Sequence, residues 1–309
     1  MLGSEFVAQF AKQGPDAWEA AAIQLARAGS SAPWPWVPIT LQANGHTAVL
    51  QVQSDDFAIG TLQDFVRLPL RPAPAQAIAN LGGHLLPTPW ITYQIAAQSA
   101  VRLDPAPLAM VPNAGANLAQ YAAHSAKINA ALSAAGLAAP ALFSGGNKSV
   151  VVSNLMGPGL VVIFGWYQPA PFGVCTTGGP ECGWPSNGLP MGTPGRQPVQ
   201  PLSNAHGDFY VDYSHGIRLV HGACMLDGVA TPTVKLYTDP ALAFLVSKEG
   251  PLKTPRYPAP ILPQPVPGLP APMAATQPPG TANVPRTLSL VDRLPGYADQ
   301  GTFWASHRA

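Results

Sequence analysis

The pattern of hydrophobic and polar positions predicts helices in the first half of the chain. Apolar residues recur at helical spacing over residues 15–29 and 116–135, and a glycine ends each pattern. Two shorter helices are expected over residues 74–81 and 89–101. Thr88 is the expected N-cap of the second, because a hydroxyl there can accept a hydrogen bond from the first turn.

The second half predicts antiparallel strands, and one further strand pair is expected earlier. The predicted strands are residues 47–53, 65–70, 148–155, 160–167, 209–220 and 223–226. We expect 65–70 to pair with 47–53, Met-Gly-Pro-Gly to link the 148–155 and 160–167 strands as a hairpin, and Asp227-Gly228 to form a turn. Residues 34–38 are too proline-rich for a central strand, and Asp239 can cap a short helix through Leu245.

Helices followed by antiparallel strands predict the α+β class, with N-terminal helices packed on a mainly antiparallel sheet. Residues 1–250 are interpreted as a single domain, with a helical part over about 1–145 and a sheet part over about 146–250. Residues 251–309 hold 13 of the 37 prolines, too many for an independent core. They are interpreted as a proline-rich C-terminal extension, either a strap on the domain or a tail.

Composition and charge narrow the expected partners. Only 10% of the 309 residues are charged and the formal net charge is +1, so nothing favours binding to nucleic acid or to an anionic membrane surface. No uncharged apolar run is long enough to span a bilayer. Low charge, many prolines and a cysteine pair favour export, so we expect a secreted or periplasmic protein whose leader is absent or removed.

The cysteines predict one disulfide. Cys175 and Cys182 flank the turn-rich Thr-Thr-Gly-Gly-Pro-Glu and are expected to close a small loop, with two free thiols as the alternative. They lie in the long segment 168–201, which we interpret as a lid over a neighbouring site. Cys224 stands alone and is expected to be a small buried hydrophobic residue rather than a nucleophile.

The main functional signal is the stretch from His206 to His221, where three of the seven histidines fall within sixteen positions. In a strand over 209–220, alternation would place one set of polar side chains on the open face and His215 on the apolar face. That polar set is Tyr210, Asp212, Ser214 and Arg218. His206 precedes the strand beside Gly207, and its imidazole is suited to proton transfer near neutral pH.

These residue types predict a catalytic constellation of His206 as general base, Asp212 orienting it, and Ser214 as nucleophile or polarising group. The structural alternative is an Asp212–Arg218 salt bridge with Ser214 as filler. His215 on the apolar face is expected to be a hydrogen-bonded core histidine.

No cofactor is expected from the ligand-type side chains in this stretch. A metal held by His206, Asp208, Asp212 and His215 is a minority interpretation, because their spacing matches no strong metal signature and alternation splits them between two faces.

Residues expected to bind substrate come from several segments. Lys148 can hold an oxyanion or a carboxylate, although a solvated surface lysine is the default interpretation of this residue. The complete expected set is Lys148, Tyr210, Arg218, Trp166 and Trp184. Thr88 stands where papain-like hydrolases place a cysteine nucleophile, but its role as an N-cap is sufficient.

Several blocks together carry a resemblance. They are Gln200-Pro-Leu, His206, the run Tyr210-Val-Asp-Tyr-Ser-His-Gly-Ile-Arg-Leu-Val220, Phe164-Gly-Trp166 upstream, and Asp239-Pro-Ala-Leu-Ala and Glu249-Gly-Pro downstream. In these blocks the chain resembles a group of uncharacterised bacterial proteins with no known activity. The similarity runs in patches from about Asp56 to Tyr257, and the loop from Gln168 is longer here. The resemblance implies a shared fold. It gives no information about the substrate.

The leading functional hypothesis is a secreted hydrolase of ester or amide bonds, acting on a small molecule or a polymer. The first alternative is a non-catalytic extracellular glycan- or polymer-binding or structural protein, with Trp34, Trp36, Trp166 and Trp184 as stacking surface. The second alternative is a papain-like cysteine hydrolase using Cys224 or Cys175. The oligomeric state is not predicted.

Overall fold

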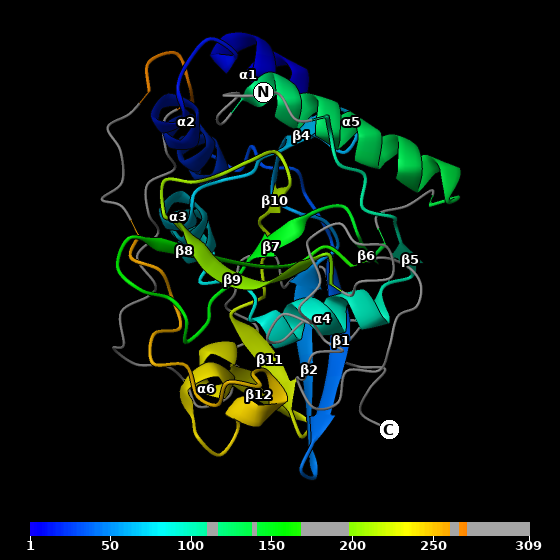
Figure 1. Cartoon of the computed structure of the whole chain (residues 1–309), viewed down its shortest axis with the longest axis vertical. Coiled ribbons are helices and arrows are strands. Elements are labelled where there is room, and N and C mark those ends of the chain that lie inside the picture. The colour runs from blue at the N-terminus through cyan, green and yellow to red at the C-terminus, as the bar shows by residue number, and fades with distance from the viewer. Residues whose placement is uncertain (110–116, 138–140, 168–197, 260–265, 271–309) are drawn as a thin grey trace, which may run out of the picture.

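The computed structural model describes residues 1–109, 117–137, 141–167, 198–259 and 266–270. Helices and mainly antiparallel sheets pack around a main hydrophobic core, so the predicted α+β class is confirmed (Figure 1). The helices are α1 (Gly3–Phe10), α2 (Pro15–Arg27), α3 (Pro72–Leu81), α4 (Pro89–Gln98), α5 (Leu118–Ala134) and α6 (Thr233–Thr238), with a 3-10 turn, η2, at Ala243–Leu245. Within these described parts no helix is long and apolar enough to cross a bilayer.

The first sheet has the strand order β1-β2-β11-β12, and all its pairs are antiparallel. Its strands are β1 (Trp36–Ala43), β2 (His46–Gln53), β11 (Ala223–Leu226) and β12 (Val229–Pro232). Asn44-Gly45 and Asp227-Gly228 close its two hairpins, and all four residues have positive φ, as two-residue hairpin turns require. The proline-bearing β1 lies at an edge, where proline is tolerated.

The second sheet positions the site and has the order β10-β7-β8-β9. Its strands are β7 (Lys148–Val150), β8 (Leu160–Gly165), β9 (Gln200–Gly207) and β10 (His215–Gly216). Only the β10–β7 pair is parallel. Along β8, Val161 and Ile163 pack into the main core, while Val162 and Phe164 pack against Trp90 of α4 and its neighbours. Side chains on both faces are therefore buried, as its apolar run predicted.

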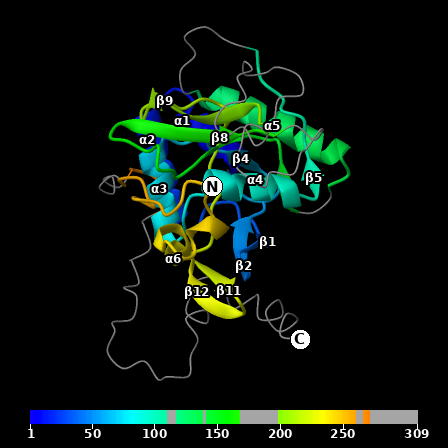
Figure 2. The same cartoon turned by 60° about the horizontal axis from the view of Figure 1, so that its bottom comes forward.

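Two short pairs complete the strands: β3 (Ala58–Gly60) antiparallel to β4 (Phe65–Arg67), and β5 (Val101–Arg102) parallel to β6 (Phe143–Ser144). The helices α1 and α5 lie at one end of the molecule, and α6 with the β11–β12 hairpin lies at the other (Figures 1 and 2). The Thr88 hydroxyl accepts from the backbone N–H of Ile91 at 3.1 Å, so the predicted N-cap of α4 is confirmed.

Two strand predictions are wrong. Residues 65–70 do not pair with β2, because β4 forms a local hairpin with β3 and the Asn44-Gly45 turn supplies β1 as the partner of β2. Residues 209–220 are not one strand, since only His215–Gly216 forms a strand, beside β7, and Val220 makes isolated bridges to Val52 and Leu85. The Asp212 carboxylate accepts the backbone N–H of Ser214 at 2.8 Å, which competes with a strand ladder.

The described part of the C-terminal extension contacts the domain. Tyr257 is buried, and its hydroxyl donates to the Val151 carbonyl at 2.8 Å and accepts from the Val162 N–H at 2.9 Å. Farther along, the Gln24 side chain bonds the backbone of Val266 and Pro270. The rest of the predicted extension lies outside the described residues.

Candidate functional site

The stretch from His206 to His221 begins in the last residues of β9. Asp208 donates its N–H to the Gly159 carbonyl at 2.8 Å, and Tyr210 donates to the Gly207 carbonyl at 2.9 Å. The chain then turns again, with the N–H of His215 3.2 Å from the Asp212 carbonyl. A folded loop rather than a strand therefore gathers the polar side chains at one point.

That point is the carboxylate of Asp212, and we call Lys148, Tyr210, Asp212 and Ser214 the Asp212 network. The oxygen Oδ1 accepts from the backbone N–H of Ser214 at 2.8 Å and from its hydroxyl at 2.6 Å. The oxygen Oδ2 accepts from the Lys148 ammonium at 2.9 Å and from the Tyr210 phenol at 2.8 Å. Four donors on one carboxylate hold all three neighbouring side chains in fixed directions.

Lys148 reaches this carboxylate from the first residue of β7. It is paired in register with His215 of β10, and its N–H donates to the Ser214 carbonyl at 2.9 Å. Its side chain is only 6% exposed. The interpretation of Lys148 as a solvated surface residue is therefore wrong. An ammonium has three donors, and Asp212 takes one of them.

The network keeps Asp212 ionised. Burial alone would raise the pKa of Asp212, but the Lys148 ammonium and the hydrogen bonds from Ser214 and Lys148 outweigh it and hold the pKa below its usual range. His215 would add to this attraction only if protonated, and burial lowers the pKa of His215 to about 3. Burial, then the Asp212 charge, raises the pKa of Tyr210, so the phenol remains a proton donor.

Three histidines, His206, His215 and His124, lie near the Asp212 network. The ring of His206 stacks on Tyr210, with centroids 4.0 Å apart and planes 15° from parallel. His206 is partly buried, and no hydrogen bond joins it to Asp212 in the described structure. The expected direct orientation of His206 by Asp212 is therefore replaced by a contact through Tyr210.

His215 is 1% exposed and lies edge-on to the Tyr210 ring at 5.6 Å. Neither ring nitrogen has a hydrogen-bond partner among the described residues, so His215 is buried as expected but is not hydrogen-bonded.

The helix α5 carries two buried polar aromatic residues that the sequence analysis did not single out. Tyr121 and His124 are three positions apart on one helix face, and both are buried. In the described structure the Tyr121 hydroxyl and the His124 Nε2 have no partner. The His124 ring lies 4.9 Å from that of Tyr213, and burial lowers the pKa of His124 to about 4. Two polar aromatic residues on one face of an alanine-rich helix were the available signal.

The other predicted residues lie elsewhere. Arg218 is 3.5 Å from Asp56 and donates to the carbonyls of Ser54 and Phe143, so the predicted Asp212–Arg218 salt bridge is wrong. The intervening turn sends Arg218 to another part of the core. Trp166 is buried, and its indole donates to the Gly145 carbonyl at 2.8 Å.

Cys224 is the only cysteine among the described residues. Cys224 is buried as expected, and burial raises the pKa of its thiol to about 11, which disfavours the thiolate. The predicted disulfide Cys175–Cys182 and the predicted contact residue Trp184 lie outside the described residues. Asp208 is exposed, and the described chain contains no group of three His, Cys, Asp or Glu side chains arranged to hold a metal ion.

No protein-family model matches the chain, and comparisons with curated proteins and with solved structures find no match.

Proposed function

We propose that the chain hydrolyses ester or amide bonds at the Asp212 network. The observation that carries this proposal is one ionised carboxylate that fixes an ammonium, a phenol and a hydroxyl beside His206. General bases and oxyanion donors act best when they are held in place before the substrate arrives.

His206 is assigned as the general base that takes a proton from the attacking water and then gives it to the leaving oxygen or nitrogen as the carbonyl bond to that atom breaks. It is the histidine of the site that is partly exposed, whereas His124 and His215 are buried. Its stacking on Tyr210 fixes the plane of the imidazole. Base catalysis needs this orientation, with the accepting nitrogen within hydrogen-bond reach of the water.

Lys148 is assigned to the negative charge that develops on the carbonyl oxygen. Asp212 takes one of its three N–H donors, which leaves two for a substrate oxygen. Ser214 is assigned a positioning role in place of the nucleophile, since its hydroxyl donates its hydrogen bond to Asp212 and not to a histidine base.

An apolar group of the substrate has a contact surface beside this centre. Phe209 is 76% exposed and directly precedes Tyr210. Its ring folds over Gly207, where an added Cβ would lie 2.5 Å from a ring carbon. An exposed aromatic ring at the edge of a polar site favours substrates with an aliphatic or aromatic acyl group.

The test is hydrolysis of chromogenic esters and anilides with acyl chains of increasing length. His206→Phe keeps a ring to stack on Tyr210 but has no nitrogen, so kcat/KM is expected to fall about 100-fold or more. Lys148→Met should lower kcat more than it raises KM. His46→Phe is the control, because His46 lies at the start of β2 and bonds Asp227. Undiminished activity of His206→Phe, or an inert wild type across the panel, would refute the proposal.

The stacking-surface alternative has little support from the described tryptophans. Trp34 and Trp166 are 8% and 7% exposed, and Trp36 packs against the rings of His84 and His221. None of these three offers the flat exposed face that a glycan ring stacks on.

A further inference from the structure

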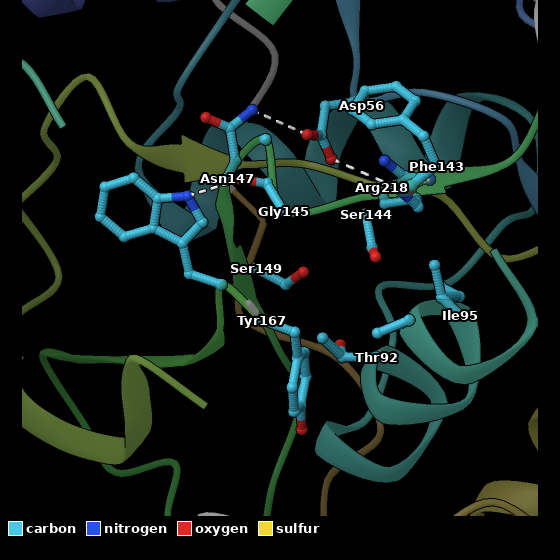
Figure 3. A pocket seen from close by; sticks show the side chains of 13 residues that line it. Asp56, Thr92, Ile95, Phe143, Ser144, Gly145, Asn147, Ser149, Tyr167 and Arg218 are labelled. Atoms are coloured by element: carbon cyan, nitrogen blue, oxygen red, sulfur yellow. Dashed lines mark hydrogen bonds and ion pairs between the residues drawn. The ribbon is translucent and has the colours of Figure 1, made fainter. Parts of the chain in front are cut away.

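A small cavity lies on the face of β7 opposite the Asp212 network. Ser149 lines this cavity (Figure 3). Side chains alternate along a strand, so the preceding Lys148 points to the opposite side, where it contacts Asp212. The cavity has a volume of about 30 Å³ and lies between α4, the loop from Phe143 to Asn147, and the end of β8. On this scale one water needs at least about 10–15 Å³, so the cavity has room for about two groups of that size.

Three serine and threonine side chains line the cavity, and the hydroxyls of two of them, Thr92 and Ser144, have no partner in the described structure. Thr92 is 7% exposed, and neither its Oγ1 nor the Ser144 Oγ makes a hydrogen bond. A helical threonine can donate to the carbonyl one turn earlier, as Thr238 does to Val234 at 3.1 Å. Thr92 does not do so, and its hydroxyl remains available to a ligand together with those of Ser144 and Ser149 (Figure 3).

Arg218 also lines the cavity. Its Nη1 donates to the carbonyls of Ser54 at 3.0 Å and Phe143 at 3.1 Å, and its Nε faces Asp56. Its Nη2 has no hydrogen-bond partner among the described residues. The Asp56 carboxylate also accepts from the Asn147 amide at 2.8 Å.

Because Arg218 and Asp56 cancel in charge, an ionic ligand would bring an uncompensated charge into the cavity.

One residue beside the cavity has a strained backbone. Trp166 has a φ of 60°, which is unfavourable for a bulky side chain. Its indole donates to the Gly145 carbonyl at 2.8 Å, and both residues line the cavity. Such strain is commonly retained where a ligand binds.

We propose that this cavity binds a primary carboxamide group. The ligand carbonyl would accept from Arg218 Nη2, and its two N–H donors would bond the hydroxyl oxygens of Ser144 and Thr92. A carboxamide is neutral, planar and offers both donors and an acceptor, which the mixed lining requires. This proposal does not depend on hydrolysis at Asp212, since the two sites lie on opposite faces of β7.

The experiment is saturation-transfer NMR on the full chain with acetamide as the probe. Acetone has the carbonyl without the N–H donors, and acetate has a charge in their place. Acetamide is expected to bind and both analogues to bind at least about tenfold more weakly, as the loss of one to two hydrogen bonds implies.

The matched variants are Thr92→Val and Thr238→Val. Both exchange a helical threonine hydroxyl for a methyl, but only Thr92 lines the cavity. Thr92→Val should weaken acetamide binding about tenfold, while Thr238→Val should bind it as the wild type does. Thermal unfolding of both variants establishes that they fold. Absent acetamide binding, equal binding of acetate or acetone, or wild-type binding by folded Thr92→Val would each overturn the proposal.

Discussion

Removing the charge of Asp212 tests whether this carboxylate makes a buried ammonium tolerable at Lys148. The two side chains are 27% and 6% exposed, and their charged atoms are 2.9 Å apart. Removing one partner of a fully buried ion pair costs about 3–5 kcal/mol. Since water can reach the Asp212 position, we expect Asp212→Asn to lose about 2–3 kcal/mol of unfolding free energy.

The coupling between the two residues comes from a double-mutant cycle. Lys148→Met leaves Asp212 with its bonds from Tyr210 and Ser214, so a smaller loss of about 1–2 kcal/mol is expected. The double variant has no unpaired ammonium and should be about 1–2 kcal/mol more stable than the summed single losses imply. Urea unfolding followed by tryptophan fluorescence gives the three values. Additive losses would show that Asp212 does not stabilise the Lys148 charge.

Three further outcomes are expected. Burial lowers the pKa of His124 to about 4 and that of His215 to about 3, whereas the pKa of an unfolded histidine is about 6.5. The unfolded state therefore takes up more protons than the folded state below pH 6.5, and the free energy of unfolding falls as the pH drops. Each histidine contributes at most about 2 kcal/mol between pH 6.5 and 5, and a flat stability profile in urea titrations would contradict this assignment. Gly216→Ala should lower the melting temperature measurably, at a loss of about 1–3 kcal/mol, because its Cβ would lie 2.7 Å from an Asp56 carboxylate oxygen. Thr88→Ala should cost about 1–2 kcal/mol in thermal unfolding through the lost α4 cap, and an unchanged midpoint would show that the cap is dispensable.

Local signals predicted much of the fold. The N-cap at Thr88, the Asp227-Gly228 turn and the doubly buried β8 each depend on a few neighbouring residues, and each is present in the structure. Pairing between distant strands was less accessible. Asn44-Gly45 is itself a strong hairpin signal. Because the prolines before it disfavour a central strand, residues 65–70 were predicted as the partner of β2 instead.

The candidate site shows the same limit. Tyr210, Asp212 and Ser214 were predicted to lie together, but the prediction assumed alternation along a strand that does not form. Their proximity comes from the Asp212 side chain bonding the Ser214 backbone two residues later, which is a local turn preference of aspartate. The same turn places Arg218 away from these three residues, whereas alternation along a strand would place it on the same face as they are.

The three-residue strand β7 carries polar side chains on both of its faces, with Lys148 on one face and Ser149 on the other. A strand between two buried layers ordinarily carries apolar side chains on each face, as Val150 and Val151 do next in the chain. Lys148 is tolerated because Asp212 neutralises it, and Ser149 because it borders a cavity rather than packed carbon. Both departures from the apolar rule occur at the start of β7, where the strand leaves the glycine loop. The two proposed sites thus lie on opposite faces of the start of β7, where each polar side chain has either a charged partner or a cavity beside it.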